Sequence, residues 1–176
     1  GKGFDRVNGD RMGMLATVIN SLALATFVQK YGVETAVFTS LPMEPVANYY
    51  MRDKAIAALE EGKVVFLSGG TGNPFFTTDS AAALRALELN ANVVLKGTKV
   101  DGVYDSDPVK NPDAVKYASL TFDKALADGL KVMDSTAFAL CKENDMPIIV
   151  FNMNIEGMLQ QVVTGHPVGT IVSNKE

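Results

Sequence analysis

The sequence contains very little cysteine and histidine, and this scarcity excludes several functional classes. Its one cysteine, Cys141, cannot form a disulfide within the chain, and its one histidine, His166, argues against a metal site built from histidines. The net charge of −4 argues against a broad surface for nucleic acid or for an anionic membrane. With 47% hydrophobic and 20% charged residues, the 176-residue chain has the composition of a reduced, cytoplasmic, soluble α/β protein with a buried core.

An apolar run near the N-terminus, residues 14–28, is the one segment that resembles a targeting signal. A targeting signal has a basic region before its apolar run, but here Asp5 and Asp10 lie in that region, and polar residues such as Thr17 interrupt the apolar run. We therefore interpret the run as an internal helix. The three-to-four residue spacing predicts that one face packs on a core. That predicted face consists of Met12, Leu15, Ala16, Ile19, Leu22, Ala23 and Phe27.

Strands and helices alternate along the rest of the chain. Predicted strands cover residues 33–39, 63–67, 92–96, 147–151 and 169–173, and predicted helices cover residues 46–61, 79–89, 121–127, 134–144 and 155–163. The strands around residues 64–67 and 148–151 are apolar at every position, which predicts cover on both faces. The alternation predicts an α/β fold with a mainly parallel sheet between helices, over a single domain of residues 1–176.

The most informative segment is the glycine-rich stretch that follows the strand predicted at residues 63–67. Ligands of such sheets bind beyond the carboxyl ends of the strands, and a glycine-rich loop before a helix exposes backbone N–H groups that can hold an anion. The stretch is neither a Walker A loop nor a G-x-G-x-x-G fingerprint. Phe75 and Phe76 are either core residues or walls for a flat ring. Three residues suit the helix N-cap, although only one can occupy it: Thr77, Thr78 and Asp79.

A second polar segment, residues 97–116, follows another predicted strand end. With Lys96 it carries lysines, a tyrosine and aspartates that can serve a nucleotide, or whose charges can satisfy one another in a solvated loop. Asp10 and Asp134 each lie at the front of a predicted helix, where a carboxylate interacts favourably with the helix dipole. We expect His166 to lie in a surface loop and Cys141 to be buried within its helix.

Together, five stretches resemble the amino-acid-kinase family, and among its members the bacterial kinases that phosphorylate UMP. The resemblance extends over residues 5–173 and is carried by residues 8–17, 70–79, 96–104 with 107–108, 130–134 and 150–154. It implies a three-layer αβα sandwich and transfer of the γ-phosphoryl group of Mg-ATP to UMP, giving UDP and ADP for pyrimidine nucleotide synthesis.

The same resemblance implies roles for individual residues. Asp79 matches a carboxylate that organises phosphoryl transfer, and Asp134 a second acidic position near it. The ATP positions are Thr98, Tyr104 and Asp107. The UMP positions are Asp10, Thr71, Gly72, Asn73, Pro74, Phe75, Phe76, Thr77 and Thr78, of which Asp10 would hold the ribose while Thr71 and Asn73 read the uracil edge. Mg²⁺ is expected to arrive on ATP with no metal ligated by the protein, and the family suggests a homohexamer that GTP activates and UTP inhibits.

Two motifs of the family are not found in this sequence, namely Lys-x-Ser-Gly and Gly-Gly-Gly-Asn followed by an arginine. Since the sequence also lacks an initial methionine, we expect the N-terminal strands of the domain to be missing and the chain alone to be inactive. Such a chain should expose sheet edges and apolar helix faces. Two alternatives stay open: a kinase of the same fold acting on a carboxylate or carbamate, and a non-catalytic nucleotide-binding protein.

Overall fold

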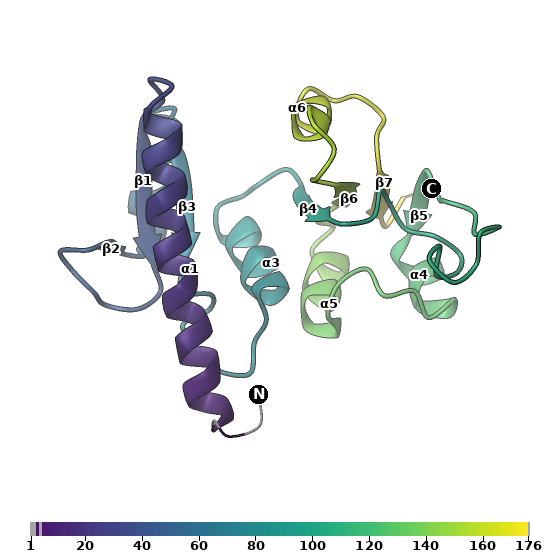
Figure 1. Cartoon of the computed structure of the whole chain (residues 1–176), viewed down its shortest axis with the longest axis horizontal. Coiled ribbons are helices and arrows are strands. Elements are labelled where there is room, and N and C mark those ends of the chain that lie inside the picture. Colours follow the sequence, from purple (N-terminus) through teal and green to yellow (C-terminus); the bar gives the residue numbers. More distant parts are fainter. Residues whose placement is uncertain (1–2, 4, 176) are drawn as a thin grey trace. The chain divides into compact units, whose positions relative to one another are not determined.

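The computed structural model describes residue 3 and residues 5–175, and the chain divides into two compact units at Leu89 and Asn90 (Figure 1). Each unit has its own sheet and its own helices.

The first unit is built on a parallel three-stranded sheet in the order β2-β1-β3. Its elements are α1 (Arg6–Gln29), β1 (Thr35–Thr39), β2 (Asn48–Tyr49), α2 (Arg52–Glu60), β3 (Val64–Ser68) and α3 (Thr78–Glu88). Both α1 and α2 contact β1 and β3, and Phe38 of β1 packs against Ala55 and Ala58 of α2. Thr39 pairs with Ser68, so β1 and β3 end together where the glycine-rich loop begins.

The second unit contains a four-stranded sheet in the order β4-β6-β7-β5. Its elements are β4 (Val94–Thr98), β5 (Ser119–Thr121), α4 (Phe122–Ala127), α5 (Ser135–Glu143), β6 (Ile148–Asn152), α6 (Met158–Val163) and β7 (Thr170–Ser173). Only the β6–β7 pair among these described strands is antiparallel. Ile148 and Val172 are fully buried in its core, where the rings of Phe122 and Phe138 meet edge to face at 5.0 Å.

The α/β class and the mainly parallel strand pairing are confirmed, and most predicted elements lie within a few residues of the observed ones. The helix predicted at residues 46–61 is wrong at its start, because residues 48–49 form β2 and the Tyr50 N–H donates to the Thr39 carbonyl. The sequence prediction also missed β5, whose three residues are too few to show a periodic pattern. Both apolar strands were predicted to be covered on both faces. The residues of β6 are buried or half-buried, as predicted, whereas Val64 of β3, an edge strand of its sheet, is exposed.

The predicted buried face of α1 is wrong. The helix buries Met14, Val18, Ser21 and Ala25, whereas Met12, Leu15, Ile19 and Phe27 of the predicted face are 46–68% exposed. The helix carries apolar residues on several of its sides, so their spacing fits more than one buried face. The small side chains of Ser21 and Ala25 permit closer packing on the sheet than the large apolar side chains of the predicted face. By length and composition alone, α1 also has the properties of a membrane-spanning helix.

Candidate functional site

The glycine-rich loop after β3 adopts a backbone conformation that requires glycine. Gly69, Gly70 and Gly72 have φ angles of 78°, 60° and 80°, in the left-handed region where other residues are strained. A Cβ on Gly69 would lie 2.9 Å from the Thr39 hydroxyl oxygen, and a Cβ on Gly72 would lie 3.1 Å from the Ser40 carbonyl oxygen. The loop therefore packs directly on the end of β1, with no space for a side chain at Gly69 or Gly72.

Two side chains tie this loop to the rest of the first unit. The Gly69 N–H donates to the Thr17 hydroxyl at 2.8 Å, and the Thr17 hydroxyl donates to the Met14 carbonyl within α1 at 2.6 Å. The Ser40 hydroxyl, just after β1, donates to the Gly70 carbonyl at 2.8 Å. The loop is thus held by α1 and by the end of β1.

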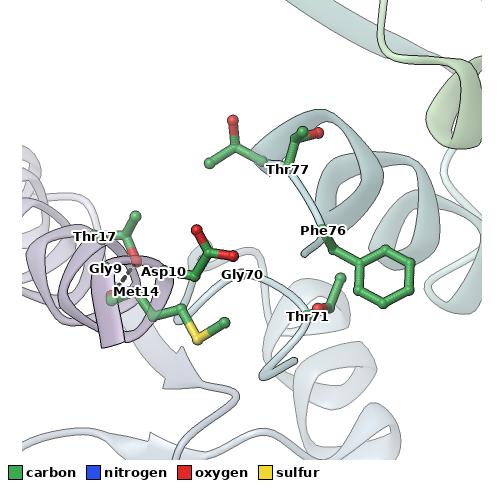
Figure 2. Close-up of a pocket in the computed structure, with 10 residues that line it drawn as sticks. Gly9, Asp10, Met14, Thr17, Gly70, Thr71, Phe76 and Thr77 are labelled. Atoms are coloured by element: carbon green, nitrogen blue, oxygen red, sulfur yellow. Dashed lines mark hydrogen bonds between the residues drawn. The ribbon is translucent and has the colours of Figure 1, made fainter. Parts of the chain in front are cut away.

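A cavity of about 210 Å³ lies beside this loop, and Figure 2 shows the side chains around it. It is lined by Gly9, Asp10, Gly13, Met14, Thr17, Gly70, Thr71, Phe76, Thr77 and Thr78. Pockets for whole ligands usually exceed about 300 Å³, so this one is sized for part of a nucleotide. Five predicted UMP residues meet here, namely Asp10, Thr71, Phe76, Thr77 and Thr78. The other four, Gly72, Asn73, Pro74 and Phe75, belong to the loop but do not line the cavity.

Asp10 joins α1 to the far end of the loop. Its carboxylate accepts a hydrogen bond from the Phe75 N–H at 2.7 Å and is paired with the Arg6 guanidinium at 2.8 Å. The Phe75 N–H first and the Arg6 guanidinium second lower the pKa of Asp10, so it is an anion and a hydrogen-bond acceptor at neutral pH. The expectation that Asp10 interacts with the helix start is wrong, because Asp5 is the N-cap and Asp10 lies in the second turn.

The two phenylalanines of the loop are exposed. Phe75 is 66% and Phe76 49% accessible, which excludes the core interpretation for both side chains in the described structure. Phe75 has a φ of 71°, and its ring centroid lies 5.4 Å from the Arg6 guanidinium carbon. Phe76 lines the cavity, so its ring is available to a flat ligand there.

The start of α3 settles which residue is the N-cap. Thr77 occupies that position, and its hydroxyl oxygen accepts a hydrogen bond from the Ser80 N–H at 3.2 Å. Thr78 is the first helical residue, and Asp79 lies in the first turn, where the helix dipole favours a negative charge. Thr77 therefore caps the helix and lines the cavity at the same time.

The second unit contains a larger cavity of about 670 Å³, within the usual range for a whole nucleotide. All three predicted ATP residues line it, namely Thr98, Tyr104 and Asp107. Lys96 and Lys131 also line it; the sequence indicated Lys96 as a group that can serve a nucleotide and gave Lys131 no role. The segment that follows β4 therefore forms a cavity wall and is not simply a solvated connection.

Within this segment the charges do largely satisfy one another. The Tyr104 hydroxyl donates to one oxygen of Asp101 at 2.5 Å, and the Lys116 ammonium donates to the other at 2.9 Å. These two contacts, Tyr104 first, lower the pKa of Asp101, while the same hydrogen bond raises the pKa of Tyr104. Asp107 accepts from the Val109 N–H at 3.0 Å. The segment can therefore line a nucleotide site and also have charges that satisfy one another, because the paired charges form part of the cavity wall.

Asp134 is the N-cap of α5, as its helix-start interpretation predicts. One carboxylate oxygen accepts from the N–H groups of Thr136 and Ala137, at 2.9 and 3.1 Å. It lines a different cavity, of about 690 Å³, with residues of α4 and α5, and its catalytic role stays a prediction. His166 is exposed and Cys141 is buried, both as expected, and burial raises the pKa of the Cys141 thiol to about 11.

The structure adds functional candidates that the sequence prediction missed. Thr17 is the clearest, and its signal was present as a polar residue that interrupts an apolar helix. Ser40 and Arg85 carried no such signal, because each looks like an ordinary surface residue in sequence. Among the residues that the structure describes, no three acidic, cysteine or histidine side chains come together to hold a metal ion.

Comparison with known proteins defines the class of protein. A model of the amino acid kinase family matches residues 3–152, and the chain belongs to that family. The matched region includes α1 and the glycine-rich loop, which places this helix inside the family's domain.

Similar proteins within the family include uridylate kinases. The chain is 54% identical over 173 residues to the uridylate kinase of Bacteroides thetaiotaomicron, with 98% of this chain and 73% of the relative covered. It is similar in structure to UMP kinase from Bacillus anthracis, with a TM-score of 0.95, 37% identity, and 99% and 72% of the two chains covered. The UMP kinase from Ureaplasma parvum gives a TM-score of 0.93 at 42% identity, with 97% and 73% covered.

Proposed function

We propose that this chain is a UMP kinase, which transfers the γ-phosphoryl group of Mg-ATP to UMP and forms UDP and ADP in pyrimidine nucleotide synthesis. The observation that carries the proposal is the cavity that brings Asp10 together with Thr71, Phe76, Thr77 and Thr78 beside a glycine-rich loop and a helix N-terminus. The uridylate kinases that resemble the chain over 98% of its length support the choice of substrate.

Each end of the acceptor nucleotide has a matching group at this loop. The ionised Asp10 accepts hydrogen bonds, as recognition of ribose hydroxyls requires, and the exposed Phe76 ring offers a flat surface for the base. Thr71 and Asn73 carry the hydroxyl and amide groups that can donate to and accept from the uracil edge. Thr78 and the first N–H groups of α3 suit the phosphate.

The donor nucleotide is assigned to the second unit, with Thr98, Tyr104 and Asp107 at its cavity. Mg²⁺ enters as part of the Mg-ATP substrate. The protein's task is to align the two phosphates for in-line attack and to neutralise charge on the transferring group. No general base is needed, because the UMP phosphate is already an oxyanion at neutral pH. Asp79 orients the cationic groups that stabilise the transferring phosphoryl group, and Asp134 is assigned a second acidic role.

Assembly and regulation are proposed on the family resemblance alone. They comprise a cytoplasmic homohexamer, activation by GTP and inhibition by UTP. The single amino-acid-kinase domain over residues 1–176 belongs to the same proposal.

Product analysis tests the function directly. Because the 176-residue chain alone is expected to be inactive, the complete protein is incubated with γ-labelled ATP and, separately, UMP, CMP and glutamate derivatives, while calorimetry measures binding of UMP and ATP. We expect UMP to bind and UDP to be the labelled product. A labelled acyl phosphate from the glutamate derivatives would instead identify a kinase of a carboxylate, and binding of both nucleotides without turnover would favour a non-catalytic protein.

A further inference from the structure

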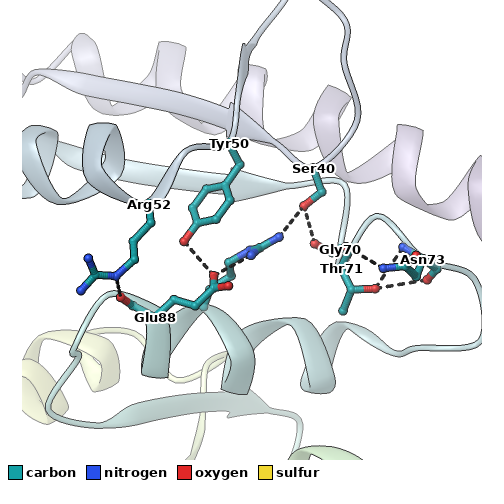
Figure 3. A network of polar contacts seen from close by, with 8 residues as sticks. Ser40, Tyr50, Arg52, Gly70, Thr71, Asn73 and Glu88 are labelled. Atoms are coloured by element: carbon teal, nitrogen blue, oxygen red, sulfur yellow. Dashed lines mark hydrogen bonds and ion pairs between the residues drawn. The ribbon is translucent and has the colours of Figure 1, made fainter.

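A network of polar contacts connects the glycine-rich loop with α3 (Figure 3), and within it Arg85 bonds to both Glu88 and Ser40. One terminal nitrogen of Arg85 pairs with the Glu88 carboxylate at 2.6 Å, and the other donates to the Ser40 hydroxyl at 2.9 Å. The guanidinium carbon lies 3.9 Å from the centroid of the Tyr50 ring, and the Tyr50 hydroxyl donates to the same oxygen of Glu88 at 2.8 Å. Because only 13% of the Arg85 side chain is exposed, solvent screens these contacts little.

Ser40 transmits this arrangement to the loop. A serine hydroxyl has a single hydrogen to donate, and Ser40 donates it to the Gly70 carbonyl at 2.8 Å. The Arg85 N–H occupies an acceptor position of the same oxygen, which fixes the direction of the hydroxyl hydrogen. Without that N–H, the hydroxyl can rotate and leave the Gly70 carbonyl without its partner.

The Gly70 carbonyl lies directly before the residues assigned to the base. Within the part of the chain that the structure describes, the side-chain hydrogen bonds of Thr71 and Asn73 join only these two residues, and the Gly72 N–H donates to the Gly69 carbonyl inside the same loop. Among the described residues, two hydrogen bonds of this kind join residues 69–73 to other elements, from Ser40 to Gly70 and from Gly69 to Thr17, and the Ser40–Gly70 bond is the nearer to Thr71. Thr71 and Asn73 are therefore held between this bond on one side and the bond from the Phe75 N–H to Asp10 on the other, and Ser40 controls the first of the two.

We propose that Arg85 is a positioning residue for the acceptor nucleotide, acting through Ser40 on the loop that reads the base. The inference rests on the proposed function, which assigns UMP to this loop. Neither Arg85 nor Ser40 lines the cavity, and their action on the nucleotide is through the loop backbone at Gly70. Arg85 sets UMP affinity and leaves ATP affinity unchanged, because the residues of the ATP cavity have no part in the network.

A double-mutant cycle tests this assignment, with calorimetric dissociation constants for UMP and for ATP. Arg85→Lys keeps a positive charge for Glu88 but loses the planar group that reaches Glu88 and Ser40 together. Ser40→Ala removes the hydroxyl. Each single variant should weaken UMP binding about 3- to 10-fold, the usual effect of one lost hydrogen bond, and the double variant should bind UMP no worse than Ser40→Ala alone.

Arg52→Lys is the matched control, because Arg52 donates to the Glu88 carbonyl at 2.7 Å and has no contact with Ser40. Its UMP affinity should equal that of the wild type. Additive losses in the double variant, or equal losses for UMP and ATP together with a lower melting temperature, would overturn the role of Arg85. Failure of the wild-type chain to bind UMP would overturn the proposed function as well, whereas wild-type UMP affinity in all variants would overturn this inference alone.

Discussion

Gly69→Ala should destabilise the first unit more than an ordinary glycine substitution. An L-residue in the left-handed conformation costs about 1–2 kcal/mol, and Gly69 has a φ of 78°. The new Cβ would also lie 2.9 Å from the Thr39 hydroxyl and 3.0 Å from the Ser40 nitrogen. Thr39 is fully buried and the Ser40 N–H donates to the Ser68 carbonyl, so neither can yield, and crowding of this kind adds about 1–3 kcal/mol. The expected total loss is about 2–5 kcal/mol.

Gly32→Ala is the matched control, because Gly32 has a φ of 77° and a Cβ there would have no atom within 4 Å. It should lose only the backbone contribution, about 1–2 kcal/mol. Urea unfolding followed by far-ultraviolet circular dichroism gives both free energies of unfolding, and calorimetry should show weaker UMP binding for Gly69→Ala alone. Equal destabilisation by the two substitutions would refute the close packing of the loop on β1.

Three further predictions address recognition, catalysis and pH. Asn73→Ala should reduce the preference for UMP over CMP by about 1–3 kcal/mol, because the uracil edge of bound UMP loses its hydrogen-bonding partner; an unchanged preference in competition assays would remove Asn73 from base recognition. In the complete protein, Asp79→Asn should lower the turnover rate by orders of magnitude with UMP binding largely intact, whereas equal losses of both would indicate a structural role at the start of α3. Burial, and then the hydrogen bond to Glu88, raise the pKa of Tyr50 from 10.0 to about 12. The unfolded chain therefore releases this proton first, and stability should fall between about pH 10 and pH 12. Tyr50→Phe should lose less stability over that range in urea unfolding, and an identical pH dependence would contradict the assignment.

The parts of the site that are local in sequence were predictable, and the parts that depend on distant contacts were not. Three glycines followed by residues that cap helices defined the strand, loop and α3 correctly, because turn and capping preferences act over a few residues. The hydrogen bond from the Phe75 N–H to Asp10 spans 65 positions, and no spacing rule indicates it. The residues of the cavity could therefore be named more reliably than their partners.

The missed features have the same physical origin. The buried face of α1 depends on which of its apolar sides meets β1 and β3, and a helix that is apolar on several sides does not specify this. Arg85 looks like a solvent-facing charge on an amphipathic helix, and its burial depends on Tyr50 and Glu88, which lie 35 residues before it and 3 residues after it. Pair interactions of this kind become visible only when the chain is folded.

Asp10 also sets a limit on how a sugar can enter. A carboxylate has about four acceptor positions, and the Arg6 guanidinium touches both oxygens while the Phe75 N–H occupies one further position. One position is left, yet a ribose presents two neighbouring hydroxyls and a deoxyribose only one. If Asp10 binds both ribose hydroxyls, one of its present hydrogen-bond donors must leave. Arg6 is the donor that can move into solvent, because its side chain is 61% exposed. Discrimination between ribonucleotides and deoxyribonucleotides then depends on how easily that guanidinium leaves the Phe75 ring.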